Sequence, residues 1–87
     1  MCLGIPAEVV ELPSEGLARV AISGVERLVS TDLLVDDAVT VGDWVLVHVG
    51  FALSRIDAEE AAITLDQIRR LGALDDEVAA FEGSSIA

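Results

Sequence analysis

The sequence predicts a mainly β protein, a small barrel followed by a C-terminal α-helix. Several short apolar segments are separated by turn residues at close intervals, a spacing that is typical of small closed or nearly closed barrels. After Asp57 the apolar residues recur at a helical period instead. Because the chain has one Trp, two Phe and no Tyr, its core must consist mostly of Val, Leu, Ile and Ala.

The expected barrel covers residues 7–56, where strand-like segments alternate with turn signals. Gly and Pro mark the turns, and residues 35–41 carry two aspartates that favour a loop leading into an edge strand. The segments predicted to be extended are 7–12, 17–23, 25–30, 44–49 and 51–56, and the predicted turns are 13–16, 23–24 and 42–43.

The segment 44–49 is the clearest strand, and its two faces differ in chemistry. Alternation places Val45, Val47 and Val49 on one face, which we expect to lie in the core. The other face carries Trp44, Leu46 and His48, and either the C-terminal helix or a partner should cover it. His48 is the only histidine, and two interpretations stay open. It is either a partly buried residue hydrogen-bonded to backbone, or a functional group. Gly50 suits an unusual turn or a close backbone approach.

A C-terminal helical segment is expected over residues 57–82, with a loose tail over 83–87. Asp57 suits the N-cap position, and Glu60 is placed to reach back to it in a capping box. Gly72 suits the end of the helix, and a second, weaker helical segment follows Asp75. The apolar residues at helical spacing are Ala61, Leu65, Ile68 and Leu71.

Length and charge limit the classes of function. The 87 residues suffice for one small domain, residues 1–87. With 16 acidic and five basic residues the net charge is −11, which argues against binding to nucleic acid or to an anionic membrane. A single cysteine cannot form an internal disulfide, and no secretory signal or spanning segment is visible. We therefore expect a cytoplasmic protein.

The first six residues, Met1–Pro6, resemble a short apolar arm with one sulfur near its tip. Because the side chain of Cys2 is small, we expect Met1 to be removed, leaving an α-amino group and a thiol on one residue. Those two groups are potential ligands for one soft metal ion. The alternative is an incidental cysteine near a chain end. A nucleophilic pair with His48 lacks a third, orienting residue, so no catalytic residue and no enzymatic activity are predicted.

Two motifs and part of the helix resemble a known family. Residues 1–6 (MCLGIP), residues 41–52 (VGDWVLVHVGFA) and the helical residues around Glu59–Ala61 are similar to the HypC/HupF/HoxL family of chaperones for the maturation of NiFe-hydrogenases. The resemblance implies an OB-like β-barrel with a C-terminal helix and no permanently bound cofactor. This chain departs from the usual pattern at Ala7–Glu8 and at Trp44.

The resemblance also implies a function, partners and site residues. Family members bind the iron–sulfur scaffold protein HypD, help to carry an Fe(CN)2CO fragment, and deliver it to the precursor of the hydrogenase large subunit. The family's essential cysteine corresponds to Cys2, a transient iron ligand, and its motif histidine to His48, a second candidate ligand. The alternative is an adaptor that bridges scaffold and precursor without ligating iron. The expected partner-binding residues are Cys2, Leu3, Gly4, Ile5 and Pro6.

Overall fold

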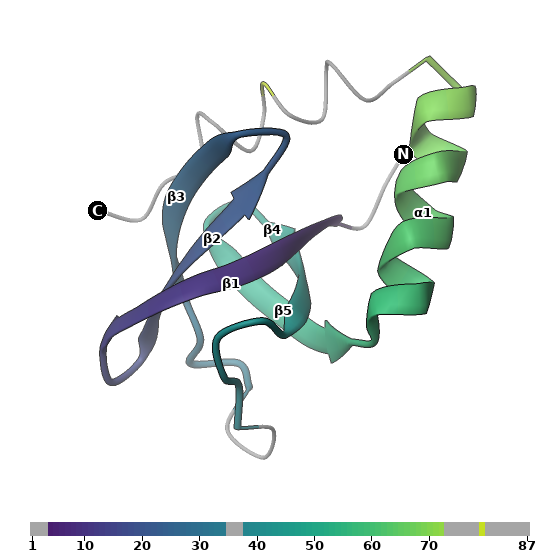
Figure 1. Ribbon diagram of the computed structural model, residues 1–87. Helices are drawn as coiled ribbons and strands as arrows, with labels where there is room; N and C mark the ends of the chain where they lie inside the picture. Colours follow the sequence, from purple (N-terminus) through teal and green to yellow (C-terminus); the bar gives the residue numbers. More distant parts are fainter. Residues whose placement is uncertain (1–3, 35–37, 73–78, 80–87) are drawn as a thin grey trace.

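The computed structural model describes residues 4–34, 38–72 and 79, which form a barrel of five strands and one long helix (Figure 1). The strands close in the order β1-β2-β3-β5-β4, and only the β3–β5 pair is parallel. The mainly β class and the barrel with a C-terminal helix are therefore confirmed, in an OB-like architecture. The elements are β1 (Ile5–Ser14), β2 (Leu17–Ile22), β3 (Val25–Ser30), β4 (Trp44–His48), β5 (Phe51–Ile56) and α1 (Ala58–Arg70).

Tight turns join β1 to β2, β2 to β3 and β4 to β5. At the β2–β3 turn both Ser23 (φ 50°) and Gly24 (φ 81°) have positive φ, the pattern that matches the twist of a hairpin. β1 continues to Ser14, beyond the turn expected to begin at Pro13. Its pairing with β2 is irregular between Glu11 and Ser14, so Pro13 lies where the ladder does not need its missing N–H group.

The connection between β3 and β4 is attached to the barrel through β1. The Val9 N–H donates to the Asp43 carbonyl (2.8 Å), and the Gly42 N–H donates to the Val9 carbonyl (2.8 Å). The Asp43 carboxylate accepts from the Thr40 N–H at 2.9 Å and so stabilises the turn that leads into β4. No strand is present at residues 31–34 or 38–43, as expected for a connection; residues 35–37 lie outside the described ranges.

The core consists of small aliphatic side chains. Val45 and Val47 point inward as expected, with 1% and 3% of their surface exposed, but Val49 does not extend this stripe. Val49 belongs to the β4–β5 turn and is 67% exposed, because β4 ends at His48. The buried residues that form one cluster are Ile5, Ala7, Val9, Ala18, Val20, Ile22, Val29, Leu34, Val45, Val47, Ala52 and Ile68.

The helix α1 begins and ends as its sequence indicates. Asp57 is the N-cap, and its carboxylate accepts from the Glu60 N–H at 3.0 Å. No reciprocal hydrogen bond from the Asp57 N–H to the Glu60 carboxylate is found among the described residues, so the cap is one-sided. The helix ends at Arg70, and Gly72 follows with φ 73°. The second helical segment and the tail expected beyond Asp75 lie outside the described residues, apart from residue 79.

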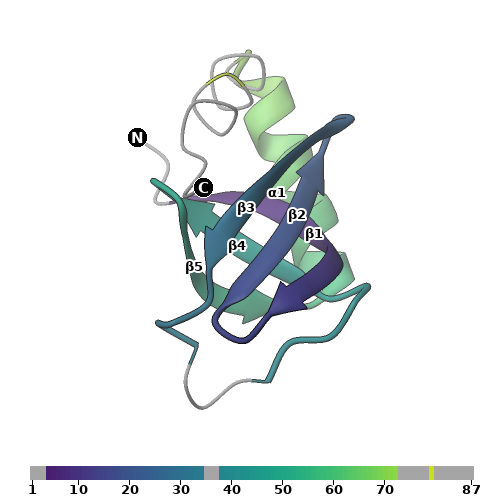
Figure 2. The same ribbon diagram turned by 90° about the vertical axis from the view of Figure 1, so that its left-hand side faces the viewer.

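One side of α1 packs against β1 and β4, as Figures 1 and 2 show. Ala61 is fully buried and Ile68 is 3% exposed, and Ile68 joins the barrel core. Ile63, on the opposite side of the helix, is 53% exposed. In the part of the chain that is described, no helix is long and apolar enough to cross a membrane.

We expect Ile68→Ala to lower the free energy of unfolding by about 2–5 kcal/mol, because it leaves a cavity between helix and barrel. The matched control on the same helix is Ile63→Ala, whose effect should stay within about 0.5 kcal/mol. Urea unfolding followed by circular dichroism measures both. Equal losses for the two variants would show that α1 does not contribute to the core through Ile68.

Candidate functional site

The predicted arm is shorter than six residues, because β1 already begins at Ile5. Ile5 pairs with Val47 inside the barrel and is 4% exposed, and Pro6 is less than 2% exposed. The side chains of Ile5 and Pro6 are therefore part of the fold, and their expected role in partner binding stays a prediction. Cys2 and Leu3 lie outside the described residues.

Gly4 is the described residue from which the arm leaves the barrel. β1 and β4 pair antiparallel with Ile5 opposite Val47 and Pro6 opposite Leu46, so Gly4 directly precedes the residue that pairs with Val47. A Cβ atom on Gly4 would lie 3.1 Å from the Val47 carbonyl oxygen and 3.4 Å from the Leu46 Cβ. Glycine therefore allows the chain to pass close to β4 at this point.

His48 is exposed at the end of β4. Its side chain makes no hydrogen bond or ion pair with the residues in the described ranges. The interpretation of His48 as a partly buried histidine bonded to backbone is therefore wrong. The helix covers the same face of β4 around Leu46 and leaves His48 accessible, so the imidazole can contact a partner, accept a proton or bind a metal ion.

The turn between β4 and β5 lies next to His48. Val49 (φ 50°) and Gly50 (φ 82°) both adopt left-handed conformations, and the Gly50 carbonyl accepts from the Ser30 N–H at 2.9 Å. The special backbone expected at Gly50 is thus confirmed. Val49 and Phe51 are surface residues, with 67% and 40% of their surface exposed. Neither was predicted from the sequence to lie at the surface. Gly50 lies between the two extended segments and indicates a turn there. A two-residue turn that includes Gly50 would have placed the end of β4 before Val49.

Several hollows lie along α1, among them one that Gly4 lines and one near Trp44. An apolar groove of about 260 Å³ runs between α1 and β4 and begins at Gly4; its lining residues are Gly4, Leu46, Ile56, Glu60, Thr64, Gln67, Ile68 and Leu71. A more polar hollow of about 560 Å³ lies near Trp44, at the opposite end of β4 from His48, and includes Asp43 and Arg55. Of these two hollows, the apolar groove is the one that Gly4 lines.

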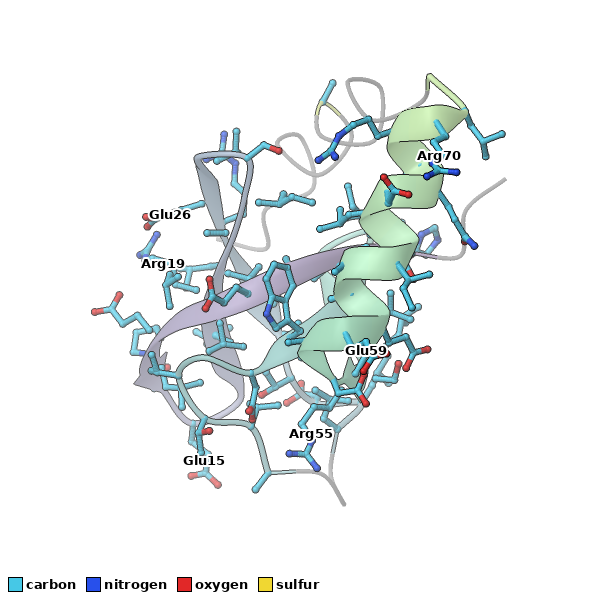
Figure 3. All side chains as sticks on the ribbon, turned by 45° about the vertical axis from the view of Figure 1, so that its right-hand side comes forward. Glu15, Arg19, Glu26, Arg55, Glu59 and Arg70 are labelled. Carbon is cyan, nitrogen blue, oxygen red and sulfur yellow. The ribbon has the colours of Figure 1, made fainter. Side chains whose placement is uncertain are left out.

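Charged groups are spread over the surface that the described residues form. Ion pairs join Arg19 to Glu11 (3.1 Å), Arg70 to Asp66 (2.9 Å) and Arg55 to Asp43 (3.8 Å), and all are at least partly solvent-exposed. Figure 3 shows labelled charged residues at the barrel hairpins and at both ends of α1. No group of three potential metal ligands occurs among the described residues, a set that leaves out Cys2.

Comparison with known proteins identifies the family. A model of the HupF/HypC family matches residues 1–68. A hydrogenase maturation factor HypC of Rhizobium leguminosarum bv. viciae is 55% identical over 69 residues, which cover 79% of this chain and 89% of the relative. The hydrogenase maturation factor HypC of Helicobacter hepaticus is 48% identical over 65 residues, 75% of this chain and 74% of the relative. The hydrogenase maturation factor HybG of Escherichia coli K12 is 43% identical over 75 residues, 82% of this chain and 92% of the relative.

The family model spans both residues 1–6 and the β4–β5 turn, and the strands next to them pair through Ile5 and Val47. Since the match with the model covers most of the 87 residues and is supported by these relatives, the chain belongs to the HupF/HypC family.

Proposed function

We propose that this protein is a hydrogenase maturation chaperone without catalytic activity of its own. It binds a HypD-like iron–sulfur scaffold protein and the precursor of the NiFe-hydrogenase large subunit, and it helps to carry the Fe(CN)2CO fragment between them. The names of the relatives support the maturation role. The structural observation that supports the proposal is the pairing of β1 with β4, in which Ile5 lies opposite Val47, the residue before the exposed His48.

Covalent geometry limits where the cargo can be held. Cys2 is two residues from Gly4 in the sequence, and two residues of extended chain span at most about 7 Å, so we infer that the cargo is held near the start of β1. A thiolate suits iron that carries cyanide and carbon monoxide, because sulfur is a soft ligand. The α-amino group of a processed Cys2 would favour the thiolate through its positive charge. His48 can add an imidazole nitrogen as a ligand or a hydrogen-bond donor to cyanide.

The second candidate function is an adaptor that joins scaffold and precursor while the iron stays on the scaffold. The observation that favours it is the exposure of Val49 and Phe51, 67% and 40%, since these apolar side chains suit docking to a protein and cannot ligate iron. The carrier and the adaptor differ in one measurable property, namely whether iron, cyanide and carbon monoxide remain on this subunit after it is separated from the scaffold.

Infrared spectroscopy of the separated subunit tests the carrier. We expect bands of cyanide and carbon monoxide on wild-type protein that is purified with its scaffold without oxygen and then separated from it. Cys2→Ala should lack these bands and should fail to mature hydrogenase, while its unfolding free energy stays within about 0.5 kcal/mol of wild type. Bands confined to the scaffold would favour the adaptor, and normal maturation by Cys2→Ala would exclude a central role for the thiol.

An extension at the N-terminus tests whether Cys2 must be the first residue of the chain, while all other residues stay the same. A Gly-Ser extension ahead of Cys2 converts its nitrogen to an amide, which removes the positive charge and the ability to coordinate iron as an amine. We expect hydrogenase maturation to fall nearly as far as with Cys2→Ala, with an unchanged far-UV spectrum. The control is the same extension placed after Ala87, which should be tolerated. Maturation at the normal rate with the N-terminal extension would exclude coordination by the amine.

His48→Ala tests the second candidate ligand. Because the imidazole is exposed and has no partner in the described ranges, its removal should change the free energy of unfolding by no more than about 0.5 kcal/mol. Hydrogenase maturation should nevertheless fall. The two readouts are the thermal midpoint and the hydrogenase activity of cells that carry the variant. Wild-type activity in His48→Ala would exclude a role for this side chain in handling the cargo.

A further inference from the structure

Trp44 borders a further hollow, of about 250 Å³, which lies between β1, the β2–β3 turn and α1. The residues that line it include Glu8, Ser23, Gly24, Trp44, Leu65 and Arg69. Trp44 is the first residue of β4 and His48 is the last. The hollow therefore lies away from the end of β4 that carries His48.

Glu8 and Trp44 lie next to each other in this hollow. The β1–β4 register pairs Glu8 directly with Trp44, and residues opposite one another in an antiparallel sheet have their side chains on the same face. Both residues are half-buried. Within the described ranges, the Glu8 carboxylate accepts no hydrogen bond and forms no ion pair, and the Trp44 indole N–H has no acceptor.

This pair of groups is suited to a cation. A partly buried carboxylate without a partner has lost some of its contacts with water, and a positive group that enters the hollow replaces them. The face of an indole ring also attracts positive charge. Arginine meets both conditions, because its planar guanidinium stacks on aromatic rings and donates two parallel hydrogen bonds to a carboxylate.

Arg69 lines the same hollow with the opposite charge, so the sign of the bound group depends on which charge is screened less. Arg69 is exposed, whereas Glu8 is half-buried. Water and salt screen an exposed charge strongly and a partly buried charge much less. Among the described residues no ion pair joins Arg69 to Glu8, so the carboxylate stays available. Glu8 therefore decides the sign, and the bound group is positive.

We propose that this hollow binds an arginine side chain of a protein partner, with the guanidinium stacked on Trp44 and hydrogen-bonded to Glu8. The methylene groups of that arginine contact the apolar wall that Leu65 provides. Tryptophan is enriched among the residues that contribute most to protein interfaces, which agrees with this role for Trp44. The inference goes beyond the proposed function, since it involves neither Cys2 nor His48.

The indole N–H signal in nuclear magnetic resonance reports on the hollow directly, because the chain has one Trp. The ¹⁵N-labelled chain is titrated with three blocked tripeptides, namely Gly-Arg-Gly, Gly-citrulline-Gly and Gly-Glu-Gly. Citrulline has nearly the shape of arginine but no charge. We expect the arginine peptide to shift the indole signal and the amide signals of Ser23 and Gly24 in a saturable manner. The citrulline peptide should bind about tenfold more weakly.

Three results of this titration would overturn the proposal. Equal affinity for the citrulline peptide would show that charge is not recognised. Stronger binding of the glutamate peptide would show that Arg69 determines the ligand. Shifts confined to the amide signals of Gly42 and Asp43 would place the peptide in the hollow on the other side of Trp44.

Variants of the two charged residues should have effects of opposite sign. Glu8→Gln keeps the size of the side chain and removes its charge, so affinity for the arginine peptide should fall about tenfold. Arg69→Gln removes a like charge, so the affinity should rise about twofold. The matched control is Glu11→Gln, the same change on β1 at a carboxylate that pairs with Arg19, and its affinity should equal that of wild type. Unchanged affinity in Glu8→Gln, or weaker binding in Arg69→Gln, would contradict the assignment.

Calorimetry with whole proteins tests the protein partner. Glu8→Gln should weaken binding to the iron–sulfur scaffold protein or to the hydrogenase precursor about tenfold, and Glu11→Gln should not. Unchanged affinity for both proteins would refute their docking through this hollow. The choice of these two proteins rests on the proposed function, whereas the peptide titration does not. Loss of maturation in Cys2→Ala together with normal binding by Glu8→Gln would therefore refute this inference alone.

Discussion

The antiparallel pairing of β1 with β4 determines both the barrel and the site. It closes the sheet, and with Ile5 opposite Val47 it turns both side chains into the core. The same register places Pro6 opposite Leu46. A shift of one residue would exchange the inward and outward faces of the strand, so the core specifies the register strongly. The position of Gly4, which directly precedes β1, is thus set by the same apolar contacts that stabilise the fold.

A barrel of five strands has a narrow interior, and the composition of the core follows from it. Ala7, Ala18 and Ala52 are at most 1% exposed, and the larger buried side chains are mainly valine and isoleucine. Among the described residues, the two aromatic side chains lie outside the core cluster: Trp44 is partly buried and Phe51 is 40% exposed. The helix covers part of the outer surface of the barrel through Ala61 and Ile68.

Features set by local chemistry could be predicted from the sequence, and those set by distant pairing could not. Alternation correctly placed Val45 in the core, and cap chemistry correctly placed Asp57 at the start of α1. Ile5 was assigned to the arm because its partner strand lies some forty residues away. Alternation also put His48 on the correct face. It could not predict that His48 is exposed, because the exposure depends on where the helix lies. Val49 was misplaced because valine is unusual at this turn position.

Closure of the barrel also explains how Val49 can keep its conformation. The turn residues are fixed from three strands: β4 ends at His48, β5 begins at Phe51, and the N–H of Ser30 at the end of β3 donates to Gly50. A β-branched residue with positive φ is strained, and such strain persists only where the surrounding structure fixes the backbone from several sides. The single residue pair between β3 and β5 is Ser30 with Phe51, so the contact that completes the barrel lies at the turn. The energy of closure therefore holds the apolar side chain of Val49 outward, next to the exposed His48 in the chain.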